Sequence, residues 1–184
     1  MTGPRKANRG PNAAQANRRA LVAAALEVFA EGGIDAPLSA VAKRAGVGQG
    51  SLYRHFPDRI SLALAAFEDN VTELEVIAAD PTCVLDDLLK AITDQAVNSV
   101  VFIDIVTTAA ADPRLEVVVE RVKATLTGTL REAHRTGAVR ESVTVDDVML
   151  AVGMVAALVG KMPPADRALT AERAWAVLRR AILP

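Results

Sequence analysis

The stretch from Leu38 to Arg59, LSAVAKRAGVGQGSLYRHFPDR, constrains the fold of this 184-residue chain more than any other. It predicts two short helices separated by a turn. Gly46 follows the predicted end of the first helix at Ala45, where a left-handed backbone costs glycine nothing. Ala42 is small enough to let two helices cross closely, and Leu52 falls on the side of the second helix that packs back against the first. The spacing therefore predicts a helix-turn-helix corner.

The residues after Gly46 distinguish this corner from an ordinary turn in a helical bundle, which A-x-x-x-G-V alone would fit equally well. Side chains able to donate hydrogen bonds to phosphate follow in quick succession: Gln49, Ser51, Tyr53, Arg54, His55 and Arg59. Such donors hold a reading helix in register on a DNA backbone, and helix-turn-helix corners place their second helix in the major groove. The pattern favours sequence-specific DNA binding.

From about Arg18 to Leu64, about a quarter of its length, the chain resembles the amino-terminal domain of TetR-family (tetracycline-repressor-like) transcriptional regulators. That family shows I-A-x-x-A-G-V, then a small residue, L-Y-x-H-F and soon a basic residue. The matching residues here are Val41-Ala42, Ala45-Gly46-Val47, Gly50-Ser51-Leu52-Tyr53-Arg54-His55-Phe56 and Arg59.

The chain departs from the family pattern at three positions. Pro37 stands where a threonine usually opens the second helix, and proline suits a first helical turn but brings no hydroxyl. Gly48 stands where a serine often caps the recognition helix. Arg59 replaces the more usual lysine and keeps its charge.

The resemblance and the apolar spacing together imply an all-α fold of about nine helices, in which a three-helix head joins a helical body. We expect a disordered basic tail at 1–15, a helix-turn-helix domain at 16–60 with its motif at about 37–56, and an effector-binding and dimerisation domain at 61–184. The first helix is expected at 16–31, stopped by Gly32-Gly33. A later helix is expected to start at Asp112-Pro113 and to end at Gly137, and the last one is expected at about 170–182. Ser99 to Ala111 is rich in β-branched residues, but no partner strand is predicted, so we expect a buried helix there.

Charge is divided unevenly along the chain. Residues 1–60 carry nine Lys/Arg against four Asp/Glu, whereas 61–184 carry twelve against eighteen. A basic head and an acidic body suit a DNA reader attached to a part that stays off DNA. The basic residues of the tail either enter a minor groove or remain solvated.

Asp58 is expected to cap a long connecting helix. Its apolar residues recur at steps of four and three, at Ile60, Leu64, Phe67, Val71 and Leu74. By resemblance, this helix carries changes in the body to the head.

Two wide apolar faces near the carboxyl end suggest a dimer interface, since helix-turn-helix proteins pair on two half-sites. The resembled family pairs its last two helices into a four-helix bundle, although an intramolecular core would give the same pattern. The candidate interface residues are Val148, Val152, Val155, Val159, Trp175, Leu178 and Ile182.

By resemblance alone, the middle helices enclose a cavity for a small-molecule effector. The candidate lining residues are Phe67, Phe102, Asp104 and Thr107. Asp104 lies within the apolar run VVFIDIV, where a carboxylate is costly unless paired. It either anchors a ligand or pairs with an internal arginine.

The sequence argues against an enzyme. Two histidines and one cysteine, Cys83, provide neither a triad nor a metal cluster, and no cofactor motif is present. We expect Cys83 to be a buried, inert thiol. Neither a signal peptide nor a membrane-spanning run is visible, which favours the cytoplasm and no membrane partner.

The sequence therefore predicts a homodimeric transcriptional regulator, most simply a repressor that a small molecule releases from a palindromic operator. The alternative is a dimeric ligand-binding protein whose head no longer binds DNA. Bases would be read by Gln49, Gly50 and Arg54, and the remaining DNA contacts would come from Ser39, Lys43, Ser51, Tyr53, His55 and Arg59.

Overall fold

The computed structural model describes residues 11–33, 35–98 and 112–182. The chain divides into two compact units, Met1–Ala66 and Phe67–Pro184, which we call the head and the body. Within the described residues every regular element is helical: eight α-helices and one short 3-10 helix. None of these helices combines the length and the hydropathy that crossing a membrane requires.

The first helix, α1 (Pro11–Gly32), begins earlier than predicted. The sequence predicted a disordered tail up to residue 15, but residues 11–15 belong to the first turns of α1. Proline is well tolerated at a first helical position because its missing N–H would have no partner there. The alanines and glutamine that follow are good helix formers. Gly33, with φ of 73°, ends the helix as expected.

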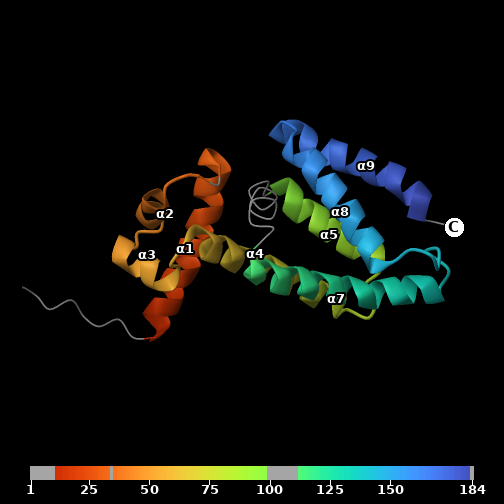
Figure 1. The fold of residues 1–184 in the computed structure, drawn as a ribbon, viewed down its shortest axis with the longest axis horizontal. Helices are drawn as coiled ribbons and strands as arrows, with labels where there is room; N and C mark the ends of the chain where they lie inside the picture. The colour runs from red at the N-terminus through yellow and green to blue at the C-terminus, as the bar shows by residue number, and fades with distance from the viewer. Residues whose placement is uncertain (1–10, 34, 99–111, 183–184) are drawn as a thin grey trace, which may run out of the picture. The chain divides into compact units, whose positions relative to one another are not determined.

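The head is completed by α2 (Leu38–Arg44), α3 (Gln49–His55) and the first part of α4 (Arg59–Ala78). Helices α1, α2 and α3 pack on one another (Figure 1). Their shared core consists of apolar side chains that are almost completely buried, among them Leu21, Phe29, Val41, Leu52 and Leu62. Burying each such side chain stabilises the fold by about 1.5–3 kcal/mol before entropy is counted.

Asp58 caps α4 as predicted: its Oδ1 accepts the backbone N–H of Ser61 at 2.6 Å. Of the predicted stripe, Leu64, Val71 and Leu74 are buried, whereas Ile60 and Phe67 are half-buried. The helix continues beyond Leu74 to Ala78.

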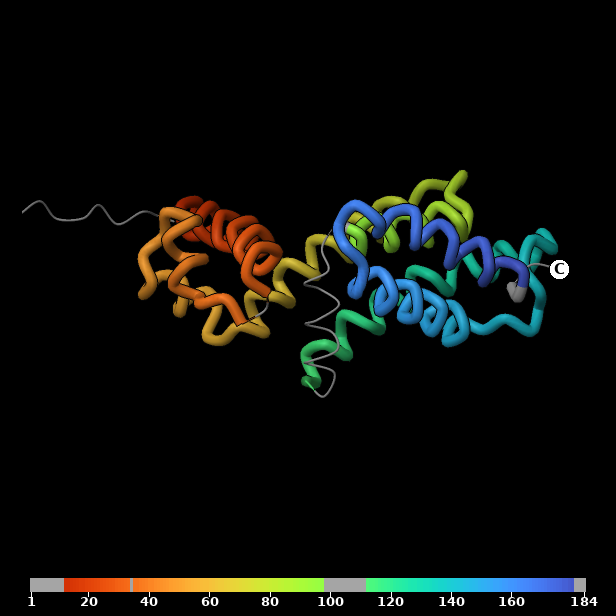
Figure 2. Tube along the Cα trace, turned by 90° about the horizontal axis from the view of Figure 1, so that it is seen from above, coloured from red at the N-terminus to blue at the C-terminus, as the bar shows by residue number. Residues whose placement is uncertain are grey.

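The body contains the rest of α4 together with α5 (Leu85–Asn98), α7 (Pro113–Arg135), α8 (Val145–Gly160) and α9 (Arg167–Ile182). A 3-10 turn at Pro164–Asp166 precedes α9, which begins three residues before the predicted start at Thr170. Helix α8 packs against α5, α7 and α9, and α5 also contacts α7 and α9 (Figure 2).

Local capping explains where the body helices start and stop. Asp112 caps α7 by accepting the N–H of Arg114, and Pro113 occupies the first turn. Thr144 and Asp147 form a reciprocal capping box at α8. At Gly137, with φ of 70°, the N–H groups of Gly137 and Ala138 return to the carbonyls of His134 and Ala133. This is a Schellman ending, and it confirms the predicted end of this helix.

The predicted helix at Ser99–Ala111 lies outside the described residues, and with it the candidate ligand residues Phe102, Asp104 and Thr107.

Candidate nucleic-acid interface and ligand cavity

The turn between α2 and α3 has the geometry that the sequence predicted. Gly46 has φ of 65°. Its N–H donates to the carbonyl of Lys43 at 3.2 Å, and the N–H of Val47 donates to the carbonyl of Ala42 at 3.0 Å. This pair of bonds is a Schellman motif, which stops α2 and redirects the chain. Gly48 then precedes α3 in an extended conformation, without a side-chain cap.

Helix α3 presents opposite faces to the core and to solvent. Leu52 is 1% exposed and anchors the helix, whereas Tyr53 is 53% exposed. Gln49, Gly50 and Arg54 are exposed as well. Residues three and four positions apart on a helix share a face, so Tyr53 lies beside Gln49 and Gly50, and Arg54 lies beside Gly50. These four predicted DNA-contacting residues therefore occupy neighbouring exposed positions on α3.

Arg54 is partly pre-oriented along this exposed face. Its Nε donates to the carbonyl of Gly50 at 3.0 Å, which leaves its terminal nitrogens as further donors. Ser51 and His55 lie half-buried at the sides of the helix.

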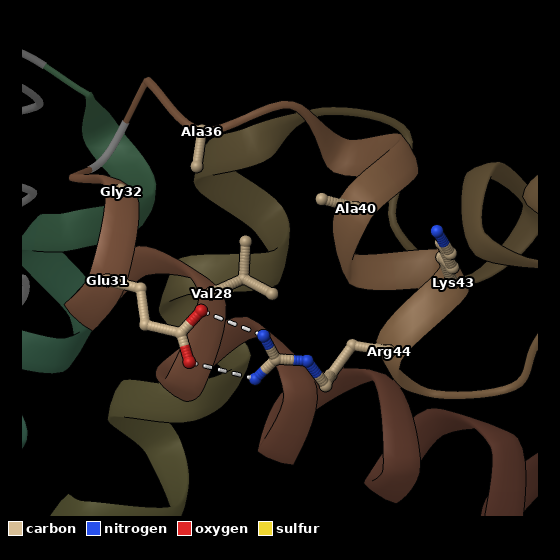
Figure 3. Close-up of a pocket in the computed structure, with 7 residues that line it drawn as sticks. All are labelled: Val28, Glu31, Gly32, Ala36, Ala40, Lys43 and Arg44. Atoms are coloured by element: carbon tan, nitrogen blue, oxygen red, sulfur yellow. Dashed lines mark hydrogen bonds and ion pairs between the residues drawn. The ribbon is translucent and has the colours of Figure 1, made fainter.

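Helix α2 adds two exposed candidates, Ser39 and Lys43. Lys43 forms no ion pair with any described residue. Its neighbour Arg44 reaches back to α1, where it pairs with Glu31 at 2.8 Å and with Glu27 at 2.9 Å. Figure 3 shows the two-pronged contact with Glu31 and Lys43 lying apart from it. Lys43 therefore keeps its charge for an external partner.

The same ion pair shapes an open hollow of about 650 Å³ on the head, lined by Val28, Glu31, Gly32, Ala36, Ala40, Lys43 and Arg44 (Figure 3). The hydrogen bond and charge of Arg44 hold the pKa of Glu31 below its usual value. The carboxylate therefore stays ionised and cancels part of the positive charge of the head.

Arg59 has a structural role that the sequence pattern did not predict. Its Nη1 donates to the carbonyl of Ala36 at 2.6 Å, and its guanidinium lies 5.7 Å from the centre of the Phe29 ring. Arg18 lies similarly over Phe56, at 5.6 Å. Arginine suits such sites because it stacks on rings and donates at the same time. Within the head, Arg59 thus ties α4 to the α1–α2 connection.

The body contains a partly open cavity of about 330 Å³. Helix α4 contributes Phe67, Asn70, Val71 and Leu74 to its wall. Helix α5 contributes Ile92, Gln95 and Ala96, and the described lining residues of α7 and α8 are all apolar or glycine. Phe67, predicted as a ligand residue, therefore does line a cavity.

The polar contacts around the cavity converge on Gln95. Its Nε2 donates to the carbonyl of Asn70 and to Oε2 of Glu73, both at 3.2 Å. Farther along α4, Glu75 forms a two-pronged pair with Arg121 of α7, at 2.8 and 2.9 Å. Both contacts hold the second half of α4 against its neighbours in the body.

The residues predicted for the dimer face are largely committed to the core of a single chain. Val148, Val155 and Val159 are buried, and buried Trp175 donates its Nε1 to Oγ1 of Thr93 at 2.7 Å. Val152 lines the cavity of the body, and Leu178 is half-buried. The side chain of Ile182 is not among those that the structure describes. Periodicity identifies a shared face without identifying what covers it, so the dimer role of these residues stays a prediction, and within one chain the buried ones pack in the core.

The exposed apolar residues of α8 lie on a different stripe. Leu150, Met154 and Leu158 recur every fourth residue and are 62%, 48% and 41% exposed. On α9, Leu169 and Val177 are exposed as well. No signal separated this stripe from the core-facing one, since both are apolar at helical spacing.

Cys83 is half-buried rather than fully buried. Burial raises the pKa of its thiol, and the carboxylates of Asp87 and Asp80 raise it further. The thiol is therefore a poor nucleophile, as nucleophilic cysteines need a lowered pKa. Among the described residues no group of His, Cys, Asp and Glu is arranged to hold a metal ion.

Comparison with known proteins agrees with this architecture. Residues 21–66 match the family described as bacterial regulatory proteins, tetR family. No curated protein matches the chain. A TetR transcriptional regulator from Streptomyces coelicolor is similar at 26% identity over 91% of this chain and 98% of that one, with a TM-score of 0.66.

Two further solved structures are similar. A TetR regulatory protein from Mycobacterium vanbaalenii is 28% identical over 81% of this chain and 95% of that one, with a TM-score of 0.58. The regulatory protein TetR from Rhodobacter sphaeroides, at 17% identity, shares the fold over 91% of this chain and 99% of that one, with a TM-score of 0.68. The amino-terminal segment thus matches the TetR family, and the chain shares its all-helical fold with solved TetR-family transcriptional regulators.

Proposed function

We propose that this protein is a sequence-specific DNA-binding repressor that a small-molecule effector releases from its operator. The observation that carries the proposal is the corner formed by α2, Gly46 and α3, with Leu52 anchored in the core and Tyr53 and Arg54 exposed opposite it. A short helix held from behind in this way suits insertion into a major groove.

The exposed face of α3 divides into two roles. Gln49, Gly50 and Arg54 read base edges, because amide and guanidinium groups match the donor and acceptor pattern of the major groove. Ser39, Lys43, Ser51, Tyr53 and His55 contact phosphates. Arg59 is better assigned to positioning the head, since its guanidinium already donates to Ala36.

The protein acts as a homodimer on a palindromic operator. Two copies pair through the exposed stripe Leu150, Met154 and Leu158 together with the apolar residues of α9. Large apolar side chains repeated on one exposed helical face are typical of an interface. Pairing places two recognition helices on successive half-sites of the operator. It is needed because a single head binds one half-site only weakly.

The effector occupies the cavity in the body and acts through α4. Four residues of this helix line the cavity, and the same helix begins in the head at Arg59. A ligand that favours one position of α4 over another changes the population of heads able to engage both half-sites.

Selection of bound fragments from host genomic DNA tests the proposal. The expected result is a palindromic consensus that binds far more tightly than a scrambled duplex, with the preference lost in Arg54→Ala and Gln49→Ala. Equal affinity for consensus and scrambled duplexes would instead favour a ligand-binding protein with a vestigial head.

A further inference from the structure

The wall of the body cavity is uncharged wherever the structure describes it. None of its described lining residues is Asp, Glu, Lys, Arg or His. An ion moved from water into such a wall loses its hydration without gaining a partner, which costs far more than burying a neutral group. The described wall therefore selects against both anions and cations.

Two amide side chains, Asn70 and Gln95, interrupt the apolar wall. Both hydrogens of the Gln95 amide are used, one on the carbonyl of Asn70 and one on Glu73. No described residue donates to Oε1 of Gln95, and this oxygen can only accept. A ligand group that complements Gln95 must therefore donate a hydrogen bond, as a hydroxyl or an N–H does.

Glu73 strengthens the discrimination against anions. Its carboxylate lies 3.2 Å from the Gln95 nitrogen, so a ligand carboxylate beside Gln95 would meet a negative charge directly behind the amide. Like charges so placed repel, although Glu73 is exposed, so water screens this repulsion and it adds only modestly to the effect of the apolar wall.

The volume limits the size of the ligand. At about 330 Å³ the cavity is roughly twice the ~150 Å³ that encloses one benzene ring in a protein core. It therefore accommodates roughly a dozen non-hydrogen atoms.

We infer that this cavity binds an uncharged, mainly apolar molecule of about that size, carrying one hydroxyl or N–H group that donates to Oε1 of Gln95. The inference rests on the proposed function, in which this cavity is the effector site, and assigns the chemistry of the effector.

Three probes with the same alkyl chain test the inference on the full-length protein: decanol, decanoate and decylammonium at neutral pH. Their affinities are measured directly by isothermal titration calorimetry, below the solubility limit of decanol and below the critical micelle concentrations of the two ions. Decanol is expected to bind at least about tenfold more tightly than either ion, the factor that corresponds to one modest polar interaction. Tighter binding of decanoate or decylammonium overturns the inference; an anchoring carboxylate, one role considered for Asp104, would favour decylammonium.

Variants locate the binding site. Ala156→Phe fills the cavity from α8 and should abolish decanol binding, whereas Ala124→Phe, at an exposed position of α7, should leave it unchanged. Circular dichroism confirms that both variants are folded. Equal loss of binding, or equal retention, in the two variants contradicts binding in this cavity.

Gln95→Leu tests the hydrogen bond independently of cavity shape. This substitution should weaken the binding of decanol several-fold but leave the binding of methyl decyl ether unchanged. The ether has the same alkyl chain but no hydrogen to donate to Gln95. Equal effects on the two probes contradict the role of Gln95.

None of these binding measurements uses DNA, so the inference and the proposed function can fail separately. If decanol binds as expected without changing operator affinity, the chemistry of the cavity is upheld and the regulatory role fails. If an ion binds more tightly and releases the operator, the regulatory role is upheld and the inference is overturned.

Discussion

The hollow on the head and the cavity in the body are built from opposite chemistry. In the head, Glu31, Lys43 and Arg44 surround an open depression whose ionic contacts are exposed (Figure 3). Such contacts add little stability and weaken with salt. In the body, apolar side chains of four helices surround a cavity whose described wall contains only two amides as polar groups.

This contrast separates two kinds of recognition. The head keeps basic and polar side chains in water, where they can exchange counterions for phosphates. The body offers an apolar wall that suits a neutral molecule. Changes in one unit should therefore affect one kind of binding and spare the other, which can be measured directly.

The largest expected loss of stability comes from truncating a buried leucine in the core of either unit. Leu52→Ala and Leu126→Ala each remove a fully buried leucine, one from the head and one from the body. Each should lower the free energy of unfolding by about 2–5 kcal/mol in urea denaturation. Leu52→Ala should abolish DNA binding but retain decanol binding, and Leu126→Ala should weaken decanol binding. The same pattern of losses in both variants would show that the two units do not act separately.

A smaller effect is expected at two basic residues of the head. Arg59→Ala should lower the free energy of unfolding by about 1.5–3 kcal/mol, because it removes a charged donor from the carbonyl of Ala36. Lys43→Ala should leave stability unchanged and reduce the slope of log affinity against log salt by about one unit. Fluorescence anisotropy at several salt concentrations measures that slope. If Arg59→Ala instead reduced the slope and spared stability, Arg59 would be a phosphate contact.

Replacing a glycine by alanine should destabilise the fold at one position in the head and stabilise it at one position in the body. Gly46 has positive φ, so Gly46→Ala should cost about 1–2 kcal/mol although nothing obstructs the new Cβ. Gly153 is helical with open space around it, so Gly153→Ala should stabilise by up to about 1 kcal/mol. Thermal unfolding of both variants checks the signs, and a stabilised Gly46→Ala would contradict the left-handed turn.

The smallest expected effect is on the pH dependence of stability under acidic conditions. The hydrogen bonds and charge of Arg114 lower the pKa of Asp112 to about 2, below the value of about 3.9 expected in an unfolded chain. A lowered pKa stabilises the fold above the unfolded value, and this contribution disappears as pH falls toward about 2. Asp112→Asn should therefore unfold with a shallower dependence on pH between about 4 and 2. Identical pH profiles would show that Asp112 does not contribute.

Local features of the head were predictable because they depend on neighbours in the sequence. The left-handed Gly46, the cap at Asp58 and the burial of Leu52 each follow from a few adjacent residues. The role of Arg59 was not predictable. A long guanidinium side chain reaches many acceptors, and only the folded head places the carbonyl of Ala36 and the ring of Phe29 beside it.

The body was predictable as helices but not as surfaces. Turn glycines and capping residues marked where helices begin and end, as at Asp112 and Gly137. No sequence signal indicated which face of α8 is buried against the other helices. Val155 and Met154 are adjacent and both apolar, yet one is buried and the other is exposed.

The amino-acid sequence by itself therefore determined the helical elements, the turn at Gly46 and the face of α3 that meets solvent, because backbone conformation and helical periodicity are local properties. Only the tertiary structure decided that Val148 and Trp175 serve the core, that Arg44 and Arg59 are used within the head, and that the amide nitrogen of Gln95 donates to α4 beside the cavity. These outcomes depend on which distant groups are brought within hydrogen-bonding or van der Waals distance, and that is set by packing.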